Sequence, residues 1–518
     1  MNIGQFLAQA AERHPDQPAL VRGDRKASYA ETNARVNALA AGLKTLGVAS
    51  GDRVGIIMHN SPQLIESFFA IWKAGACAVP LNARFRAGEV NYHLDDSEAS
   101  AIVFGEEFRA MMANLADQLR TTRCFVCTGN PGQGQVSYED LIESHASGRE
   151  VCVDTSDDDL AWLFYTSGTT GKPKGAMLTH ANLAFMAVNW VADLTPLEPE
   201  DVGLHAAPLT HGAGFHSIAL TLKGAQQVLL DPPRFDAENL CAAVEKYRVT
   251  NTWLVPTQIK ILLNYAGLEK WDLSSLKWVV YGGSPMYVED LKAAIRRIGP
   301  VFVQLYGQGE TPMTGTYFRA QEHRLEGPES RRLASCGHVR SGIELRILDE
   351  NDEEVCRGAV GEICVRGPSV MKGYWRRPDA TAASLRGGWL HTGDVARMDE
   401  DGYVYIMDRT TDMIISGGAN VFPREVEEVL LDHPAVSEAC VFGVPDELWG
   451  EAVKAVIVLD NGALATEEEI IGFVGERIAG YKKPKSVDFT DALPKSAYGK
   501  ILKRELRDKY RTEAQGTA

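Results

Sequence analysis

The sequence is short of positive charge, of long hydrophobic runs and of paired cysteines. Its 518 residues hold 53 Lys and Arg against 69 Asp and Glu, for a net charge of −16. Because nucleic acids bind to basic faces, this balance argues against DNA or RNA as a partner. No run reaches the ~18 apolar residues that cross a bilayer, and the N-terminal residues lack the apolar core of a signal peptide. We therefore expect a cytoplasmic protein with no integral membrane segment.

The nine cysteines are scattered, and only Cys124 and Cys127 form a CxxC pair. Because no second pair and no nearby histidine accompany them, a zinc site is not expected there. A redox pair is one alternative, and a buried strand is the favoured one. Thiols that stay unpaired are typical of a reducing cytoplasm.

Short β-branched runs alternate with helical periods over roughly the first 400 residues. Strands are predicted at 54–58, 77–81, 100–105, 161–165, 227–231, 251–256, 277–283 and 301–307. Helices are predicted between them, for example at 62–76 and 288–299. Such alternation is typical of parallel, doubly wound sheets, in which ligands bind beyond the carboxyl ends of the strands. The segments YTSGTT, YGGSP and YGQGE each follow a predicted strand in this way.

The pattern of predicted elements changes towards the C-terminal end of the sequence. Turn signals such as DEND and DEDG separate short strands, and after residue 410 a compact set of helices and strands follows. The predicted fold is α/β, with a large N-terminal domain of doubly wound sheets, a β-rich subdomain and a small α+β C-terminal domain. The boundary falls in the charged turn DRTTD, between residues 1–410 and 411–518.

The stretch YTSGTTGKPKG (165–175) is rich in glycine, hydroxyls and lysine. It is not a Walker-type loop, because Pro173 follows the lysine where Ser or Thr is needed. Backbone N–H groups, hydroxyls and two ammonium groups in one turn suit a polyphosphate. A mobile surface loop explains the composition about as well, so this segment alone leaves both interpretations open.

Further motifs follow in order: YGQGET (306–311), GYWRRPDAT (373–381), HTGD (391–394) with DRTTD (408–412), and LPKSAYGKILKREL (493–506). Together with the 165–175 loop they resemble the adenylate-forming superfamily of acyl-CoA synthetases, adenylation domains and luciferases. The resemblance covers nearly the whole chain. It implies an adenylation domain at 1–410 that binds ATP and the acyl group. It also implies a mobile domain at 411–518 that supplies a catalytic lysine and coenzyme A contacts.

The resemblance gives each motif a role in the reaction with ATP. Glu310 matches the carboxylate that coordinates Mg²⁺, and Lys500 matches the mobile lysine of the first half-reaction. Residues matched to ATP are Thr166, Ser167, Gly168, Thr169, Thr170, Lys174, Gly283, Ser284, Pro285, Tyr306, Gly307, Gly309, Asp394 and Arg409. Because a carboxylate that attacks a polyphosphate brings two anions together, positioned cations and Mg²⁺ are the expected stabilisers.

Two positions depart from the pattern of the resembling family. Gly309 stands where the family usually has Thr before the Mg²⁺-binding Glu, which removes one hydroxyl contact worth about 1 kcal/mol. Thr411 stands at the hinge, where Asp or Lys is usual. A hinge only needs to absorb backbone rotation, so motion is still expected.

The second half-reaction is matched mainly to the C-terminal domain. Ser416, Gly417 and Gly418 match a loop beside the pantetheine arm, where glycines allow close approach of an extended chain. The residues matched to the nucleotide end of coenzyme A are Arg84, Trp449, Tyr481, Lys483 and Lys485. An aromatic face for adenine and lysines for a phosphate suit that ligand, although a basic turn is also typical of a solvated surface.

The segment PLTHGAGF (208–215) resembles the one that carries a gate residue at the acyl pocket, and His211 matches that gate. Other candidates for the pocket are Gly212, Trp190, Val255 and Gly282, and the helical stretch 181–191 is apolar enough either to line it or to be core. Relatives that activate amino acids carry Asp here. Its absence favours a fatty or aryl acid without an α-amine.

The expected activity is therefore that of an acyl-CoA synthetase. An acid and ATP give acyl-AMP and pyrophosphate, and coenzyme A then gives acyl-CoA and AMP. An acyl-AMP ligase that loads a carrier protein and a nucleotide-binding relative without catalysis are the alternatives. The expected partners are a small carboxylic acid, ATP, Mg²⁺ and coenzyme A, and a homodimer is one open alternative for the assembly.

Overall fold

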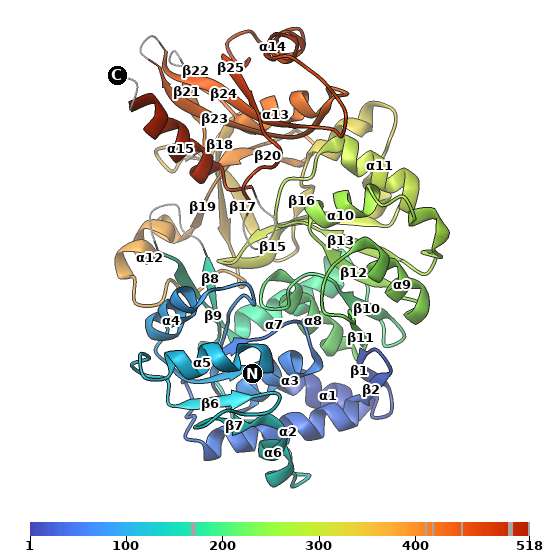
Figure 1. Cartoon of the computed structure of the whole chain (residues 1–518), viewed down its shortest axis with the longest axis vertical. Helices are drawn as coiled ribbons and strands as arrows, with labels where there is room; N and C mark the ends of the chain where they lie inside the picture. The colour runs from blue at the N-terminus through green and yellow to red at the C-terminus, as the bar shows by residue number, and fades with distance from the viewer. Residues whose placement is uncertain (167–171, 410–411, 417–418, 447–448, 496–500, 516–518) are drawn as a thin grey trace.

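Two large, mostly parallel β-sheets form the N-terminal part of the molecule (Figure 1). The structure is a computed structural model, and it describes all residues except 167–171, 410–411, 417–418, 447–448, 496–500 and 516–518. The seven-stranded sheet is parallel apart from the β8–β9 hairpin. Its strand order is β7 (Val136–Ser137), β6 (Cys124–Cys127), β5 (Ala99–Phe104), β3 (Arg53–Ile57), β4 (Cys77–Pro80), β8 (Leu160–Thr166) and β9 (Lys174–Thr179).

The nine-stranded sheet is parallel at its centre and antiparallel at both edges. Its order is β16 (His338–Val339), β15 (Thr311–Phe318), β14 (Phe302–Gln308), β13 (Trp278–Tyr281), β12 (Asn251–Leu254), β10 (Val202–His205), β11 (Gln226–Leu229), β1 (Pro18–Arg22) and β2 (Arg25–Ser28). All eight predicted strands are present. Cys124 and Cys127 begin and end β6, as the buried-strand interpretation of that CxxC pair expects.

Helices cover both faces of these sheets, as the doubly wound prediction requires. The N-terminal helices are α1 (Gln5–Arg13), α2 (Tyr29–Thr45), α3 (Pro62–Lys73), α4 (Ala87–Asp96), α5 (Arg109–Leu115), α6 (Tyr138–Ser144), α7 (His180–Asn189), α8 (Gly212–Lys223), α9 (Ala237–Tyr247), α10 (Pro256–Leu263), α11 (Val288–Ile298) and α12 (Pro378–Ser384). Ser28 caps α2 in a capping box with Glu31, and Ser61 caps α3 ahead of Pro62. These residues are standard helix starts, so the local sequence fixes where the helices begin.

Neighbouring residues of one strand enter different cores. Along β5, Val103 packs into a core shared by both sheets, while Ile102 and Phe104 pack under α4 and α5. Along β12, Trp253 joins the shared core and Leu254 packs on the opposite face. Because side chains alternate along a strand, each sheet is buried on both faces, and the shared core joins the two sheets into one body.

A four-stranded antiparallel sheet is the β-rich subdomain that the sequence predicts. It consists of β17 (Glu344–Leu348), β18 (Val360–Arg366), β19 (Leu390–Met398) and β20 (Val404–Arg409). The C-terminal part has its own sheet and core, formed by β22 (Ala419–Val421), β21 (Ile414–Ser416), β24 (Gly450–Leu459), β23 (Val436–Asp446) and β25 (Ser486–Phe489). Its helices are α13 (Pro423–Leu431), α14 (Glu467–Gly475) and α15 (Lys503–Gln515).

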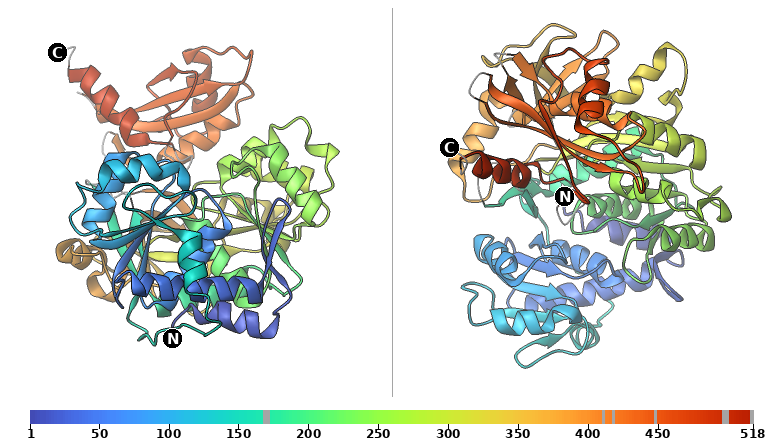
Figure 2. Two further views of the ribbon diagram at one scale, coloured as in Figure 1. Left: turned by 60° about the horizontal axis from the view of Figure 1, so that its bottom comes forward. Right: turned by 45° about the horizontal axis from the view of Figure 1, so that its top comes forward.

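The C-terminal sheet and its helices lie at one end of the molecule in Figure 1 and in the left view of Figure 2. The α/β fold class and the small α+β domain are thus confirmed. Within the described residues, no helix is long and apolar enough to cross a membrane.

Candidate active site

The carboxylate of Glu310 lies in the bend between β14 and β15. Its side chain is buried, and Oε1 accepts hydrogen bonds from the hydroxyls of Thr166, at 3.0 Å, and Tyr374, at 2.8 Å. Thr166 is the last residue of β8, in the other large sheet. Glu310 therefore joins the two sheets at their carboxyl ends, which is where ligands of such sheets bind.

The two lysines of the 165–175 stretch face different rings. The ammonium of Lys174 lies 4.5 Å from the ring centre of Tyr374, the residue that donates to Glu310. Lys172 is exposed, and its ammonium lies 5.2 Å from the ring centre of Tyr92. A backbone hydrogen bond explains why Lys174 faces Tyr374. Trp375 donates its N–H to the carbonyl of Gly175 and so holds the 373–381 segment against β9. Only Lys174 is directed to the Glu310 side.

Asp394 is the centre of a second polar cluster. Its Oδ2 accepts from the hydroxyl of Tyr306 at 2.7 Å and from the amide of Gln308 at 2.6 Å, while Oδ1 lies 3.1 Å from Nε of Arg409. Asp394 raises the pKa of Arg409, and Glu310 adds to that effect. Gln308, which donates to Asp394, stands two residues before Glu310 in the chain, so the clusters around Glu310 and Asp394 form one site.

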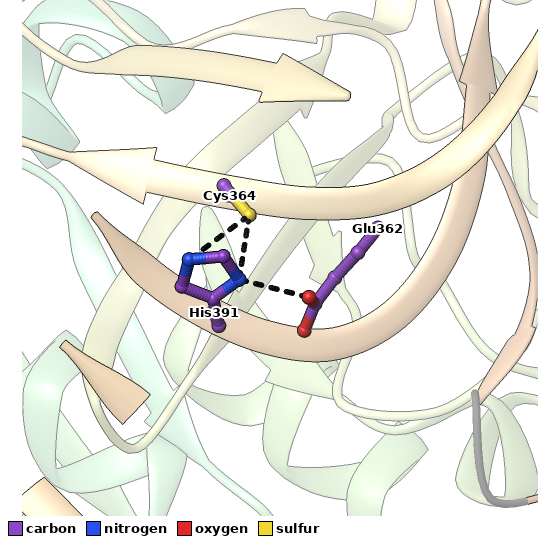
Figure 3. Close-up of side chains that lie close together, drawn as sticks. All are labelled: Glu362, Cys364 and His391. Carbon is purple, nitrogen blue, oxygen red and sulfur yellow. Dashed lines mark hydrogen bonds and ion pairs between the residues drawn. The ribbon is translucent and has the colours of Figure 1, made fainter. Parts of the chain in front are cut away.

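A network of Glu362, Cys364 and His391 holds the HTGD turn in place (Figure 3). Glu362 accepts from the backbone N–H of Gly393 at 2.7 Å, and its second oxygen lies 2.9 Å from Nδ1 of His391. The thiol of Cys364 lies 3.2 Å from the same nitrogen. These three side chains offer ligand atoms within 4.8 Å of one another. Arg386, however, forms an ion pair with Glu362, so a cation already neutralises this carboxylate. The hydrogen bonds among the three side chains explain why they lie close together.

The glycines matched to the nucleotide walls lie where either the backbone conformation or close packing favours glycine. Gly283 has a φ of +81°, which favours glycine, and a Cβ on Gly307 would lie 2.7 Å from the Cα of Met313. Ser284 and Pro285 follow in the same loop after β13. A Cβ on Gly309 would lie 2.4 Å from the ring of Phe164. Phe164 thus fills the space that a threonine at 309 would need.

Two of the residues matched to the acyl pocket, Gly212 and Gly282, lie beside Trp253. A Cβ on Gly212 would lie 3.5 Å from the indole, and a Cβ on Gly282 would lie 3.3 Å from it. His211 precedes α8 and packs against Phe164, with ring centres 4.7 Å apart. Burial lowers the pKa of His211 to about 4, so its imidazole is neutral near pH 7.

The other two acyl candidates are placed differently. Helix α7 ends at Asn189, and Trp190 begins a π-helical turn, Trp190–Leu194. Its indole is fully buried, stacks on His216 and lies 6.3 Å from the ring of Trp253. Trp190 therefore forms the layer behind Trp253. Val255 is half-buried just before α10.

Lys500 lies outside the described residues, and so do Ser167, Gly168, Thr169, Thr170, Thr411, Gly417 and Gly418. Residues on either side of the segment 496–500 are described. Lys495 and Ile501 pair in an antiparallel bridge, and Leu502 donates its N–H to the carbonyl of Pro494. The segment that carries Lys500 is thus closed at its base, immediately before α15.

A buried ion cluster links this segment to the hinge region. The ammonium of Lys503 lies 3.0 Å from Glu427 and 3.5 Å from Asp408. Burial alone would lower the pKa of Lys503, but the two carboxylates outweigh it and raise that pKa. Asp408 precedes Thr411, whereas Glu427 and Lys503 follow it. The cluster therefore crosses the predicted domain boundary.

Part of the proposed coenzyme A set comes together in the C-terminal sheet. Lys485 places its ammonium 5.0 Å from the ring centre of Trp449, which is 40% exposed. Ser416 of β21 pairs with Gly450, the residue after Trp449. Tyr481 is exposed and Lys483 is half-buried in the loop after α14. Arg84 is exposed after β4, in a different sheet, and only the family pattern groups it with the others.

Two residues of the site, Tyr374 and Gln308, are not identified by the motif patterns. Tyr374 contacts Glu310 and Lys174, and Gln308 donates both to Asp394 and to the carbonyl of Thr392. Both lie inside motifs that were recognised, GYWRRP and YGQGE. A polar side chain within a ligand-binding motif was the available signal, although its partner cannot be read from sequence.

Comparison with known protein families agrees with this geometry. The model described as "AMP-binding enzyme" matches residues 7–375, and "AMP-binding enzyme C-terminal domain" matches residues 425–500. The chain belongs to the AMP-binding enzyme family. It is an adenylate-forming ligase, an enzyme of the AMP-forming acid–CoA ligase type.

Its relatives act on different acids. It is 39% identical to a feruloyl-CoA synthase of Amycolatopsis sp., over 98% of this chain and 99% of that protein. It is 36% identical to the medium/long-chain-fatty-acid–CoA ligase FadD8 of Mycobacterium tuberculosis, over 98% of this chain and 90% of that protein. The comparisons therefore show the reaction family and leave the acid open.

Among solved structures, ATP-bound MatB of Rhodopseudomonas palustris is 32% identical and has a TM-score of 0.89, with 99% of each chain covered. The apo structure of MatB, at the same identity, has a TM-score of 0.78 over 99% of this chain and 100% of that chain. By this score our structure is more similar to the ATP-bound structure of MatB than to the apo structure.

Proposed function

We propose that this enzyme activates a fatty or aryl carboxylic acid with ATP and transfers the acyl group to coenzyme A. The observation that carries the proposal is the joining of Glu310, Asp394 and Arg409 in one site at the carboxyl ends of both large sheets. The pairing of Trp449 with Lys485 supports coenzyme A as acceptor, because it offers an aromatic face beside a cation.

In the first step, a carboxylate oxygen of the acid bonds to the α-phosphorus of ATP while the bond to the β-phosphate oxygen breaks. Pyrophosphate leaves with that electron pair. Negative charge builds up where the two anions meet, so fixed cations lower the barrier. In the described site, Arg409 and Lys174 are these cations. Tyr306 and Gln308 hold the carboxylate of Asp394 in position, and it can accept hydrogen bonds from the ribose hydroxyls.

The site also fits Mg²⁺. This ion prefers oxygen ligands and is commonly held by one or two carboxylates together with substrate phosphates. Glu310 is a buried carboxylate whose Oε1 accepts two hydroxyl bonds, which fixes the orientation of the group. Glu310 would hold the ion, and the ion would neutralise charge on the phosphates.

In the second step, the sulfur of coenzyme A attacks the acyl carbon of acyl-AMP, AMP leaves with the anhydride oxygen, and the thiol proton is released. We propose that the C-terminal domain, residues 411–518, moves between the steps about the region of Thr411, and that Lys500 serves only the first step. Lys503, three residues after Lys500, forms an ion pair with Asp408, three residues before Thr411, which supports a coupling of the two.

A panel of carboxylic acids tests the proposal. Purified enzyme with ATP and Mg²⁺ should release pyrophosphate with at least one fatty or aryl acid, and added coenzyme A should yield the thioester. Glu310→Gln should abolish both. Pyrophosphate release without a thioester would favour a ligase that loads a carrier protein, and no release with any acid would contradict the proposal.

All nine cysteines are free, which is consistent with the expected cytoplasmic location.

A further inference from the structure

We infer that Asp96, the last residue of α4, is a positioning residue that anchors both segments that hold Glu310 and so supports the binding of Mg²⁺ with ATP. The inference rests on the proposed function, because that proposal assigns Glu310 to the metal. Two hydroxyls, those of Thr166 and Tyr374, orient Oε1 of Glu310. Asp96 accepts a hydrogen bond from the neighbour in the chain of each of these two donors.

The first anchor is the end of β8. Oδ2 of Asp96 accepts a hydrogen bond from the hydroxyl of Tyr165 at 2.9 Å. Burial, followed by the charge of Asp96, raises the pKa of this phenol, so Tyr165 remains a donor. Tyr165 and Thr166 are the last two residues of β8, and side chains alternate along a strand. Asp96 therefore holds the strand from one face while Thr166 donates to Glu310 from the other.

The second anchor is the 373–381 segment. The indole N–H of Trp375 donates to the backbone carbonyl of Asp96 at 3.1 Å, and Arg377 forms an ion pair with Oδ1 of the same residue. The hydrogen bond to Asp96 raises the pKa of Arg377, so the guanidinium stays charged. Trp375 directly follows Tyr374, so this anchor lies one residue from the second donor to Glu310.

One carboxylate thus joins parts of the chain that are far apart in sequence. Tyr165 lies 69 residues from Asp96, and Arg377 lies 281 residues from it. Without the charge of Asp96, the phenol and the guanidinium lose their common partner, and the donors to Glu310 are held less firmly. Because a misplacement of about 1 Å can cost ~100-fold in rate even when the mutated residue is remote, such an anchor matters for catalysis without touching a substrate.

The neighbouring residue in α4 provides a matched control. Asp95 pairs with Arg120 at 2.9 Å, and the side chains of Asp95 and Asp96 are 14% and 11% exposed. Arg120 lies between α5 and β6, so this pair holds a segment outside the site. Asp95→Asn therefore removes a similar carboxylate from the same helix end and leaves both anchors of the Glu310 region in place.

The test measures binding of a nonhydrolysable ATP analogue with Mg²⁺ by calorimetry, together with the Mg²⁺ dependence of pyrophosphate release. Asp96→Asn keeps the shape of the side chain but offers one acceptor oxygen to two donors. It should weaken analogue binding and raise the half-saturating Mg²⁺ concentration, each by ~10-fold, as loss of a hydrogen bond to a charged group does. KM for the carboxylic acid should stay unchanged. Tyr165→Phe should shift both quantities in the same direction, and Asp95→Asn should shift neither.

The alternative is an ion pair that only stabilises the fold, and thermal unfolding of each variant identifies it. Equal weakening of analogue binding in Asp95→Asn and Asp96→Asn, or unchanged binding in Asp96→Asn, overturns the inference. If Asp96→Asn fails to fold, Tyr165→Phe decides, because unchanged binding of the analogue and Mg²⁺ in that variant also overturns it. If wild-type enzyme binds the analogue but releases pyrophosphate with no acid, the proposed function fails, and the binding measurements still decide the role of Asp96.

Discussion

The hydroxyl of Tyr374 donates a 2.8 Å hydrogen bond to Glu310, while the face of the same ring lies 4.5 Å from the ammonium of Lys174. One side chain therefore positions the carboxylate proposed to hold Mg²⁺ and the lysine proposed to hold the phosphates. Burial, followed by the charge of Glu310, raises the pKa of the phenol, so Tyr374 remains a donor. Tyr374 is thus a positioning residue for the metal and phosphate region.

Replacing Tyr374 with Phe should weaken the use of Mg²⁺ while keeping the ring under Lys174. A hydrogen bond to a charged group contributes about 1.5–3 kcal/mol, so kcat/KM for pyrophosphate release should fall ~10- to 100-fold. The half-saturating Mg²⁺ concentration should rise, and direct Mg²⁺ binding by calorimetry with a nonhydrolysable ATP analogue should weaken in parallel. Tyr92→Phe, which removes a hydroxyl that donates to the carbonyl of Pro173, is the control and should change neither. Loss of rate with unchanged Mg²⁺ affinity would count against the positioning role.

The two lysines of the 165–175 stretch should differ in importance. Lys174→Ala should lower kcat/KM for ATP by ~100-fold or more, as removal of one fixed charge-stabilising group does in other enzymes. Lys172→Ala should lower it less than ~3-fold, because the Lys172 ammonium is exposed and faces Tyr92. Steady-state kinetics with varied ATP measures both. An equal loss of kcat/KM in the two variants would contradict this prediction and would mean that both ammonium groups bind ATP.

The contacts of Tyr374 and Gln308 cannot be read from the sequence. The α/β class and the eight strands follow from periodicity and spacing, whereas Glu310, Asp394 and Arg409 are assigned from the resemblance of their motifs to the adenylate-forming superfamily. The contact of Tyr374 with Glu310 spans 64 residues and that of Gln308 with Asp394 spans 86, so they depend on how separate sheets pack. The filling of the Gly309 space by Phe164 is likewise a matter of packing. Motif patterns identify which segments meet, and tertiary packing decides which atoms touch.

Buried histidines should make the fold less stable as pH falls below neutrality. Burial lowers the pKa of His180, His205, His211 and His323 from 6.5 to about 4. In the unfolded chain these groups take up protons near pH 6.5, whereas in the folded protein they do so only near pH 4. The unfolded state therefore binds more protons in this window, and the free energy of unfolding falls as pH drops through it.

The size of this effect is of the order of 2–3 kcal/mol for each histidine by pH 4. Urea unfolding at several pH values between 6.5 and 4 measures it. Acidic residues also titrate at the low end of this range, so the decisive comparison is between variants. His205→Asn should show a shallower dependence on pH than wild type, and the exposed-site control His59→Asn should not. Parallel curves for all three proteins would contradict the assignment.

The cluster of Lys503, Glu427 and Asp408 should matter for adenylation more than for thioester formation. Removing one partner of a buried ion pair costs about 3–5 kcal/mol, because the remaining charges stay buried. Lys503→Met should therefore loosen the base of the Lys500 segment where it meets Asp408.

Two assays separate the steps: pyrophosphate release from ATP and acid, and thioester formation from supplied acyl-AMP and coenzyme A. Lys503→Met should reduce the first at least ~10-fold more than the second, as Lys500→Ala should, because positioning a reacting group strongly affects rate. Lys495→Met is the matched control, since Lys495 lies in the same segment and pairs with Glu438 within the C-terminal domain, at 2.7 Å. If Lys503→Met slows both steps equally, the cluster stabilises the fold without serving the first step. A selective loss would instead show that the ion cluster across the hinge holds the lysine segment in place for adenylation.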